Sequence, residues 1–160
     1  MLGAIFPVVE IESFNDLLPY LSGKVFHVTL ASNWDDITAV GKLLVNTSDR
    51  LSPFGNTVNG YFRFKGCVSF FDYRAYGSAE WEDHSYKCLP TLPLEAQSHI
   101  LVLFLSQSEH HKLRSWEGWK QDQLWSYRVV PYVECGYPGS VELSAIQEVL
   151  HVRKKSNLTA

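Results

Sequence analysis

The chain has 160 residues, 46% of them hydrophobic and 19% charged, and its formal net charge at pH 7 is −3. This length and composition predict one globular domain over residues 1–160. The small negative charge provides no overall attraction to nucleic acid, so any such contact would be local. No apolar run has the length of a membrane span, and the N-terminal residues lack the pattern of a secretory signal. A soluble, cytoplasmic protein without membrane contact is expected.

Cysteine and histidine spacing argues against disulfide and metal frameworks. The three cysteines, Cys67, Cys88 and Cys135, are an odd number and contain no C-x-x-C pair. His110 and His111 are adjacent, so on a helix they would point to different faces, and no third ligand has a suitable spacing. Reduced thiols and no metal site are expected.

The first third of the sequence predicts a helix, a strand and a second helix. Ser13 is a candidate N-cap for a short helix that Gly23 should terminate. Residues 24–30 alternate in hydropathy, which indicates a strand with His27 and Thr29 on the same face. After Ser32 or Asn33 as a cap, apolar residues recur at helical spacing and predict a helix that continues through Gly41; they are Ile37, Val40, Leu43 and Leu44.

The middle of the sequence is less regular. Residues 46–60 are rich in Asn, Ser, Asp, Pro and Gly, which predicts a long loop of the kind that covers binding sites. Residues 66–74 are dense in aromatic and β-branched side chains and predict a strand that ends on the cation Arg74. Residues 75–97 carry no pattern that assigns them to an element.

The last third predicts a central strand, a tryptophan-bearing helix and a closing strand. Residues 99–105 are continuously apolar, as in a strand buried on both faces. Residues 113–124 have roughly helical apolar spacing, residues 144–148 resemble one or two helical turns, and residues 149–152 resemble a strand. The tail from residue 153 is expected to be frayed. Strands and helices without regular alternation indicate an α+β fold.

One carboxylate requires a specific explanation. Residues 129–134 form an apolar run that predicts a strand ending on Glu134, just before the turn residues Pro138 and Gly139. A carboxylate at the end of a buried strand costs free energy unless it is paired or used. Glu134 is therefore the first candidate for a functional residue.

Three motifs, in this order along the chain, together resemble the ADP-ribosyltransferase fold, in particular the DarT-type DNA ADP-ribosyltransferase toxins and their relatives. The first consists of Phe26-His27-Val28-Thr29 with Asn33, Ile37, Gly41 and Leu43; the second is Val68-Ser69-Phe70-Phe71-Asp72-Tyr73-Arg74; the third is Val133-Glu134-Cys135-Gly136-Tyr137-Pro138-Gly139-Ser140-Val141 with Ile146 and Val149. The similarity spans about residues 24–153. It implies split, mostly antiparallel β-sheets with flanking helices.

The resemblance also implies a substrate and roles for individual side chains. NAD would be the substrate, and Glu134 and Arg74 would be catalytic. NAD-binding residues would be His27, Thr29 and Asn33, with Phe70, Phe71 or Tyr73 stacking on the nicotinamide ring. The strands that carry His27, residues 68–74 and Glu134 should then be neighbours around one cleft.

Two functions remain open at this point. The resemblance implies a bacterial toxin or phage-defence effector that transfers ADP-ribose to a nucleic acid or protein and that a cognate antitoxin could restrain. The alternative is a non-enzymatic immunity or inhibitor protein that binds a partner toxin through aromatic side chains, which make up 14% of the chain. The tryptophans at positions 116, 119 and 125 fit a core or lid better than a base-stacking platform, although Lys112, Arg114, Lys120 and Arg128 are near them.

Overall fold

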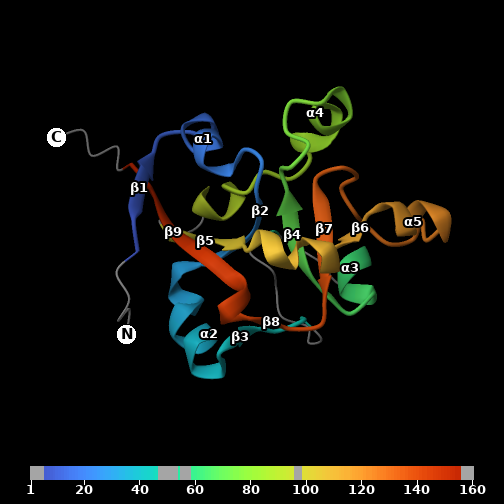
Figure 1. Cartoon of the computed structure of the whole chain (residues 1–160). Coiled ribbons are helices and arrows are strands. Elements are labelled where there is room, and N and C mark those ends of the chain that lie inside the picture. The colour runs from blue at the N-terminus through green and yellow to red at the C-terminus, as the bar shows by residue number, and fades with distance from the viewer. Residues whose placement is uncertain (1–5, 47–53, 55–58, 96–98, 156–160) are drawn as a thin grey trace.

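The computed structural model describes residues 6–46, 54, 59–95 and 99–155 and has an α+β architecture (Figure 1). Its strands form a seven-stranded sheet and a separate two-stranded sheet. The strands are β1 (Val8–Ile11), β2 (Val25–Leu30), β3 (Lys42–Leu43), β4 (Cys67–Asp72), β5 (His99–Leu105), β6 (Arg114–Ser115), β7 (Glu134–Pro138), β8 (Val141–Glu142) and β9 (Ile146–Lys154).

Short helices connect these strands. The α-helices are α1 (Leu18–Leu21), α2 (Trp34–Val40), α3 (Tyr61–Phe64), α4 (Ala79–Ser85) and α5 (Glu117–Gln121). The short 3₁₀ helices are η1 (Phe14–Asp16), η2 (Ala31–Asn33), η3 (Leu92–Glu95), η4 (Gln107–Lys112) and η5 (Leu143–Ala145). No helix in the described part of the chain has the length and hydropathy needed to cross a bilayer.

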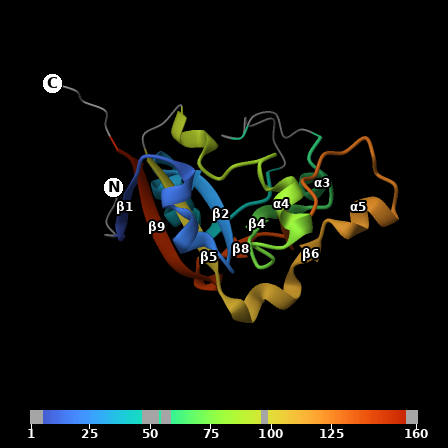
Figure 2. The ribbon, with the colours of Figure 1, turned by 90° about the horizontal axis from the view of Figure 1, so that it is seen from above.

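The large sheet has the order β1-β9-β5-β2-β4-β7-β6. Only β1 and β9 pair in parallel, and every other neighbouring pair is antiparallel. Seen from above, β1 and β9 lie at one end of the molecule and α5 lies at the other (Figure 2). The predicted mostly antiparallel sheet with flanking helices is therefore confirmed.

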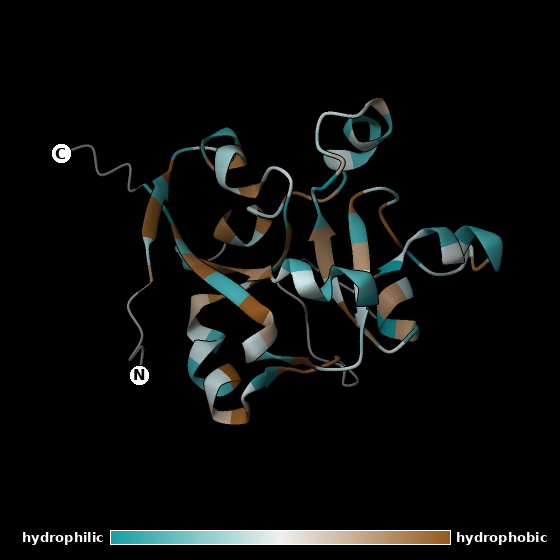
Figure 3. Ribbon diagram, in the orientation of Figure 1, coloured by the Kyte–Doolittle hydropathy of each residue, from teal (hydrophilic) through white to brown (hydrophobic). Residues whose placement is uncertain are grey.

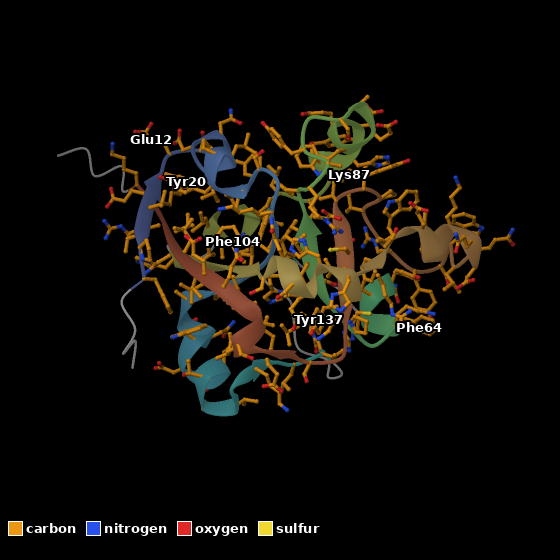
Figure 4. All side chains as sticks on the ribbon, viewed as in Figure 1. Glu12, Tyr20, Phe64, Lys87, Phe104 and Tyr137 are labelled. Carbon is orange, nitrogen blue, oxygen red and sulfur yellow. The ribbon has the colours of Figure 1, made fainter. Side chains whose placement is uncertain are left out.

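The core is divided between the two faces of this sheet. Phe26, Val28 and Phe104 belong to one buried cluster, which α1 and α4 help to enclose, whereas Val25 and Leu103 belong to the cluster on the opposite face. The middle strands are accordingly hydrophobic along most of their length, and α4 and α5 are largely hydrophilic (Figure 3). Phe104 lies inside this core, while Phe64 projects near α3 and α5 (Figure 4).

Several predicted elements of the first half are confirmed, and one helix boundary is wrong. The strand over residues 24–30 is β2, and the first helix is present as η1 followed by α1. The second helix does not continue through Gly41, because Gly41 has φ 86° and forms the left-handed C-cap of α2. Leu43 therefore belongs to β3, which pairs with β8. Most of the predicted loop over residues 46–60 lies outside the described residues.

The second half contains three further corrections. The predicted central strand over residues 99–105 is confirmed as β5. The helix expected over residues 113–124 is wrong: β6 pairs with β7 at residues 114–115, and only the five residues of α5 are α-helical. Glu134 is the first residue of β7, not the last residue of a strand, because residues 131–133 form a turn. The closing strand, β9, runs from Ile146 to Lys154, so the helical turns expected over residues 144–148 and the frayed tail expected from residue 153 are wrong there.

A third, smaller cluster attaches α3 and the segment around α5 to the edge of the sheet. It contains buried Tyr61, Phe62 and Cys67, with Trp116 and Trp119 packed against them. Gly136 of β7 makes this packing possible. A Cβ atom at this position would collide with the ring of Phe62 and lie 2.9 Å from the Cβ of Cys67.

Replacing Gly136 with alanine should therefore lower the free energy of unfolding by about 1–3 kcal/mol, the usual cost of overpacking a core. Chemical denaturation of the wild type and the variant would measure this loss. Gln147→Ala, at an exposed position of β9, is the matched control and should change stability little. Equal stability of Gly136→Ala and wild type would contradict this account of the packing.

Candidate functional site

The three strands that carry the motif residues are neighbours in the sheet, in the order β2-β4-β7 (Figure 1). β4 pairs with β7 at every position from Cys67 to Phe71. In contrast, β2 and β4 pair only at Val25↔Asp72 and Phe26↔Phe71. The backbone ladder between β2 and β4 ends at Phe26, so from His27 onward these two strands do not pair with each other.

The side chain of His27 bridges this unpaired region. Its Nδ1 lies 2.8 Å from the carbonyl oxygen of Ser69 on β4. A carbonyl can only accept, so Nδ1 carries the proton and donates. Burial lowers the pKa of His27, partly opposed by this hydrogen bond. The imidazole is therefore neutral at neutral pH, and its Nε2 is a hydrogen-bond acceptor.

Glu134 is held by the turn that precedes it. Its Oε2 accepts a hydrogen bond of 2.6 Å from the backbone N–H of Val130, and its own N–H donates to the Val130 carbonyl at 3.0 Å. Burial raises the pKa of Glu134, and the hydrogen bond from Val130 opposes that shift. The carboxyl group is thus fixed in position by backbone atoms and poorly solvated.

The turn before Glu134 contains a strained residue that the sequence did not indicate. Tyr132 has φ 66°, in the left-handed region that costs a non-glycine residue free energy. Its ring lies 5.5 Å from the ring of His84 on α4 and 4.7 Å from that of Trp116, measured between centroids. Rings from two other segments therefore help to fix the turn that positions Glu134. A tyrosine gives no sequence signal for this conformation.

Arg74 is placed just after β4 and is paired with Asp72. Its Nε donates to Oδ1 at 2.9 Å and its Nη2 to Oδ2 at 2.8 Å, in a bidentate arrangement. The hydrogen bonds that Arg74 donates to Asp72 raise the pKa of the guanidinium. Burial, and then the charge of the nearby Arg74, lower the pKa of His110. The side chain of Arg74 remains 41% exposed, so part of it is accessible.

Strand alternation does not place His27 and Glu134 on one face. Val25 and Phe70 share a buried cluster, so the Cβ of His27 points to their side of the sheet. Glu134 is in register with Phe71, which belongs to the cluster on the opposite side. The expectation that both side chains line one cleft is therefore wrong, because the strand geometry puts them on opposite faces of the sheet. His27 lies on β2 and Glu134 on β7, with β4 between them.

The other predicted NAD-binding side chains have structural roles. Asn33 Nδ2 donates to the hydroxyl of Thr29 at 3.1 Å, and Thr29 is only 7% exposed. Phe70, Phe71 and Tyr73 are 1%, 7% and 0% exposed, so none presents a free ring face to a ligand in this conformation. Their expected role in stacking on nicotinamide is not supported, because packing in the two core clusters occupies these rings.

Glu134→Gln should raise the thermal unfolding midpoint at pH 7. The raised pKa of Glu134 means that ionisation opposes folding, so stability is lost as pH rises through its folded-state pKa. Glutamine keeps an oxygen to accept from Val130 but carries no charge. Calorimetry at pH 7 and pH 4 should show a gain that shrinks at the lower pH; Glu148→Gln, at an exposed position, is the control. A clear loss of stability at pH 7 would identify Glu134 as a structural residue.

The site as a whole brings a fixed carboxylate, a neutral histidine and a paired arginine to neighbouring strands. The order of these strands agrees with the order of the three motifs. Comparison of the chain with protein-family models, curated proteins and solved structures found no match. The likeness to ADP-ribosyltransferases is therefore a resemblance of motifs.

Proposed function

We propose that the protein is an NAD-dependent ADP-ribosyltransferase that uses Glu134 as its catalytic carboxylate. The observation that carries the proposal is the position of Glu134: a half-buried carboxyl group, fixed by the Val130 N–H, at the start of a strand adjacent to the aromatic motif strand. A carboxyl group held in this way costs stability when ionised, which catalysis would explain. The short backbone ladder between β2 and β4 supports the proposal because it leaves fewer backbone hydrogen bonds between two of the three motifs.

The chemistry requires a carboxylate next to the ribose. When the bond between nicotinamide and ribose breaks, nicotinamide leaves with the bonding electrons and positive charge develops on the ribose, as in glycoside cleavage. Glu134 would accept a hydrogen bond from a ribose hydroxyl and stabilise that charge. A preorganised group of this kind lowers the activation barrier by roughly 3 kcal/mol. The acceptor then forms a bond to the same ribose carbon and loses its proton.

His27 and Arg74 would bind the nucleotide rather than exchange protons. The Nδ1–H of His27 is committed to Ser69, so only Nε2 remains, and it accepts a hydrogen bond from a hydroxyl group. The exposed part of Arg74 would donate to the pyrophosphate or position the acceptor. Asp72 supports this role by holding the guanidinium in a fixed orientation.

The acceptor in this proposal is a nucleic acid or a protein, and the biological role is that of a toxin or phage-defence effector under the control of a cognate antitoxin. Aromatic and basic side chains lie together near α5, which supports an acceptor site there. Trp125 is 57% exposed and its ring centroid is 4.8 Å from that of Trp119. Arg114 and Lys120 belong to the same segment.

The same surface favours a second function, that of a protein which binds a partner toxin without catalysis. Phe64, Trp125 and Tyr132 are 53%, 57% and 37% exposed, and exposed aromatic side chains are common interface anchors. Phe64 stacks on Tyr127 at a centroid distance of 4.2 Å, so its ring is already ordered and would lose little entropy on binding. Here Glu134 would only close its turn.

Millimolar NAD should raise the melting temperature if the enzymatic proposal is correct. A ligand that binds only the folded state stabilises it by mass action, and at about ten times the dissociation constant the shift is on the order of a few degrees. His27→Ala should reduce the shift, and Arg74→Ala should reduce it only if the guanidinium holds the pyrophosphate. Exposed His111→Ala is the control for histidine loss. No shift with NAD, together with a shift on adding a co-encoded partner, would favour the binding protein.

Glu134→Gln should abolish transfer of ADP-ribose while leaving the NAD-induced shift in melting temperature largely intact. The carboxylate acts mainly on charge that develops in the transition state, so its loss affects rate more than binding. Mass spectrometry of candidate nucleic acids and proteins incubated with NAD would detect the transfer. Turnover at the wild-type rate in this variant would exclude Glu134 as the catalytic group.

A further inference from the structure

Two histidines far apart in the sequence lie side by side on one face of the large sheet, on the neighbouring strands β5 and β9. His99 begins β5, and His151 lies on the neighbouring strand β9. Their ring nitrogens, Nδ1 of His99 and Nε2 of His151, are 2.9 Å apart, and the ring centroids are 5.0 Å apart at an interplanar angle of 61°. This pair is separate from the site around Glu134.

The backbone holds the two imidazoles close together. In the antiparallel ladder His151 is in register with Leu101 and His99 with Arg153, so the two histidines are diagonal neighbours on one face. β5 pairs with β9 from His99 to Leu105 and with β2 from Ile100 to Phe104. Chelating groups on such a rigid support lose little entropy when they bind an ion.

The electrostatic surroundings also permit a cation. The guanidinium of Arg153, the nearest basic group in the register, forms an ion pair with Glu10 on β1. Burial and the neighbouring His99 lower the pKa of His151, which favours the neutral form of that ring. Neutral imidazole is the form that binds a metal, and both rings are only partly buried.

We propose that His99 and His151 form a two-histidine chelate for a divalent transition-metal ion that prefers right-angle coordination, Cu²⁺ or Ni²⁺, with water in the remaining positions. Imidazole nitrogens bind such ions at about 2.0–2.1 Å, so two nitrogens at a right angle are about 3.0 Å apart and two at a tetrahedral angle about 3.4 Å apart. The observed 2.9 Å matches the right-angle case.

Binding requires only local changes. The proton that one of these nitrogens donates to the other moves through solvent to the second nitrogen of its own ring, so this tautomer change releases no net proton. Each ring then rotates so that the lone pairs of the two nitrogens point toward one metal ion, which lies to the side of the line joining the nitrogens. Among the described residues no three His, Cys, Asp or Glu side chains converge as ligands, so the chelate has two protein ligands.

The test uses the full chain without a histidine tag, after treatment with a chelator. Titration with CuCl₂ or NiCl₂ should raise the melting temperature by a few degrees at about ten times the dissociation constant, with Cu²⁺ effective at a lower concentration than Ni²⁺ and MgCl₂ without effect. With one equivalent of Cu²⁺, electron paramagnetic resonance should show coupling to two imidazole nitrogens.

The variants His99→Gln and His151→Gln should each lose the two-nitrogen spectrum. Each should also need at least a tenfold higher metal concentration for the same rise in melting temperature, measured against its own metal-free value. His111→Gln removes an exposed histidine outside the pair and should behave as wild type. Equal Cu²⁺ binding by wild type and His151→Gln would overturn the proposal, as would an equal response of all three variants.

Discussion

The structure depends on the burial of β5 at the centre of the large sheet. Six consecutive residues of this strand, from Ile100 to Leu105, are between 0% and 2% exposed. Alternate side chains enter the two core clusters, while the backbone is hydrogen-bonded to β2 on one side and β9 on the other. A strand of this kind can exist only if both faces and both edges are covered. The positions of β2 and β9, and through them of the remaining strands, follow from this requirement.

The edge of β2 that faces away from β5 is treated differently. Beyond Phe26 it has no ladder with β4, and the imidazole of His27 provides the link to Ser69. His27 and Glu134 are half-buried groups, and their pKa shifts change the stability in opposite directions as the pH is varied. The lowered pKa of His27 removes stability as pH falls below its usual value, and the raised pKa of Glu134 removes stability as pH rises. At neutral pH the loss of stability therefore comes from the ionisation of Glu134 rather than of His27. This cost is the physical reason for proposing a catalytic role for Glu134.

The aromatic residues divide into two groups with different consequences. Those of the central motif strand fill the core: Phe71 and Tyr73 pack around Phe26 at centroid distances of 5.3 and 5.0 Å. Those around α5 form the exposed surface near the turn of Glu134. The second group connects the proposed catalytic turn to a surface suited to an acceptor or a partner. The enzymatic and binding functions proposed for the chain would thus use adjoining parts of one surface.

The sequence alone determined the elements whose signal is local. The apolar run of residues 99–105 required burial on both faces, and the alternation around His27 required a strand, because hydrophobic periodicity follows directly from backbone geometry. Glu134 could be singled out as a carboxylate that follows an apolar run. Only the tertiary structure decided that Gly41 ends its helix, that Glu134 begins its strand, and that His27 and Glu134 belong to opposite faces. It also decided that His99 and His151 meet. These outcomes depend on strand register and on contacts between segments far apart in the chain, which no local pattern encodes.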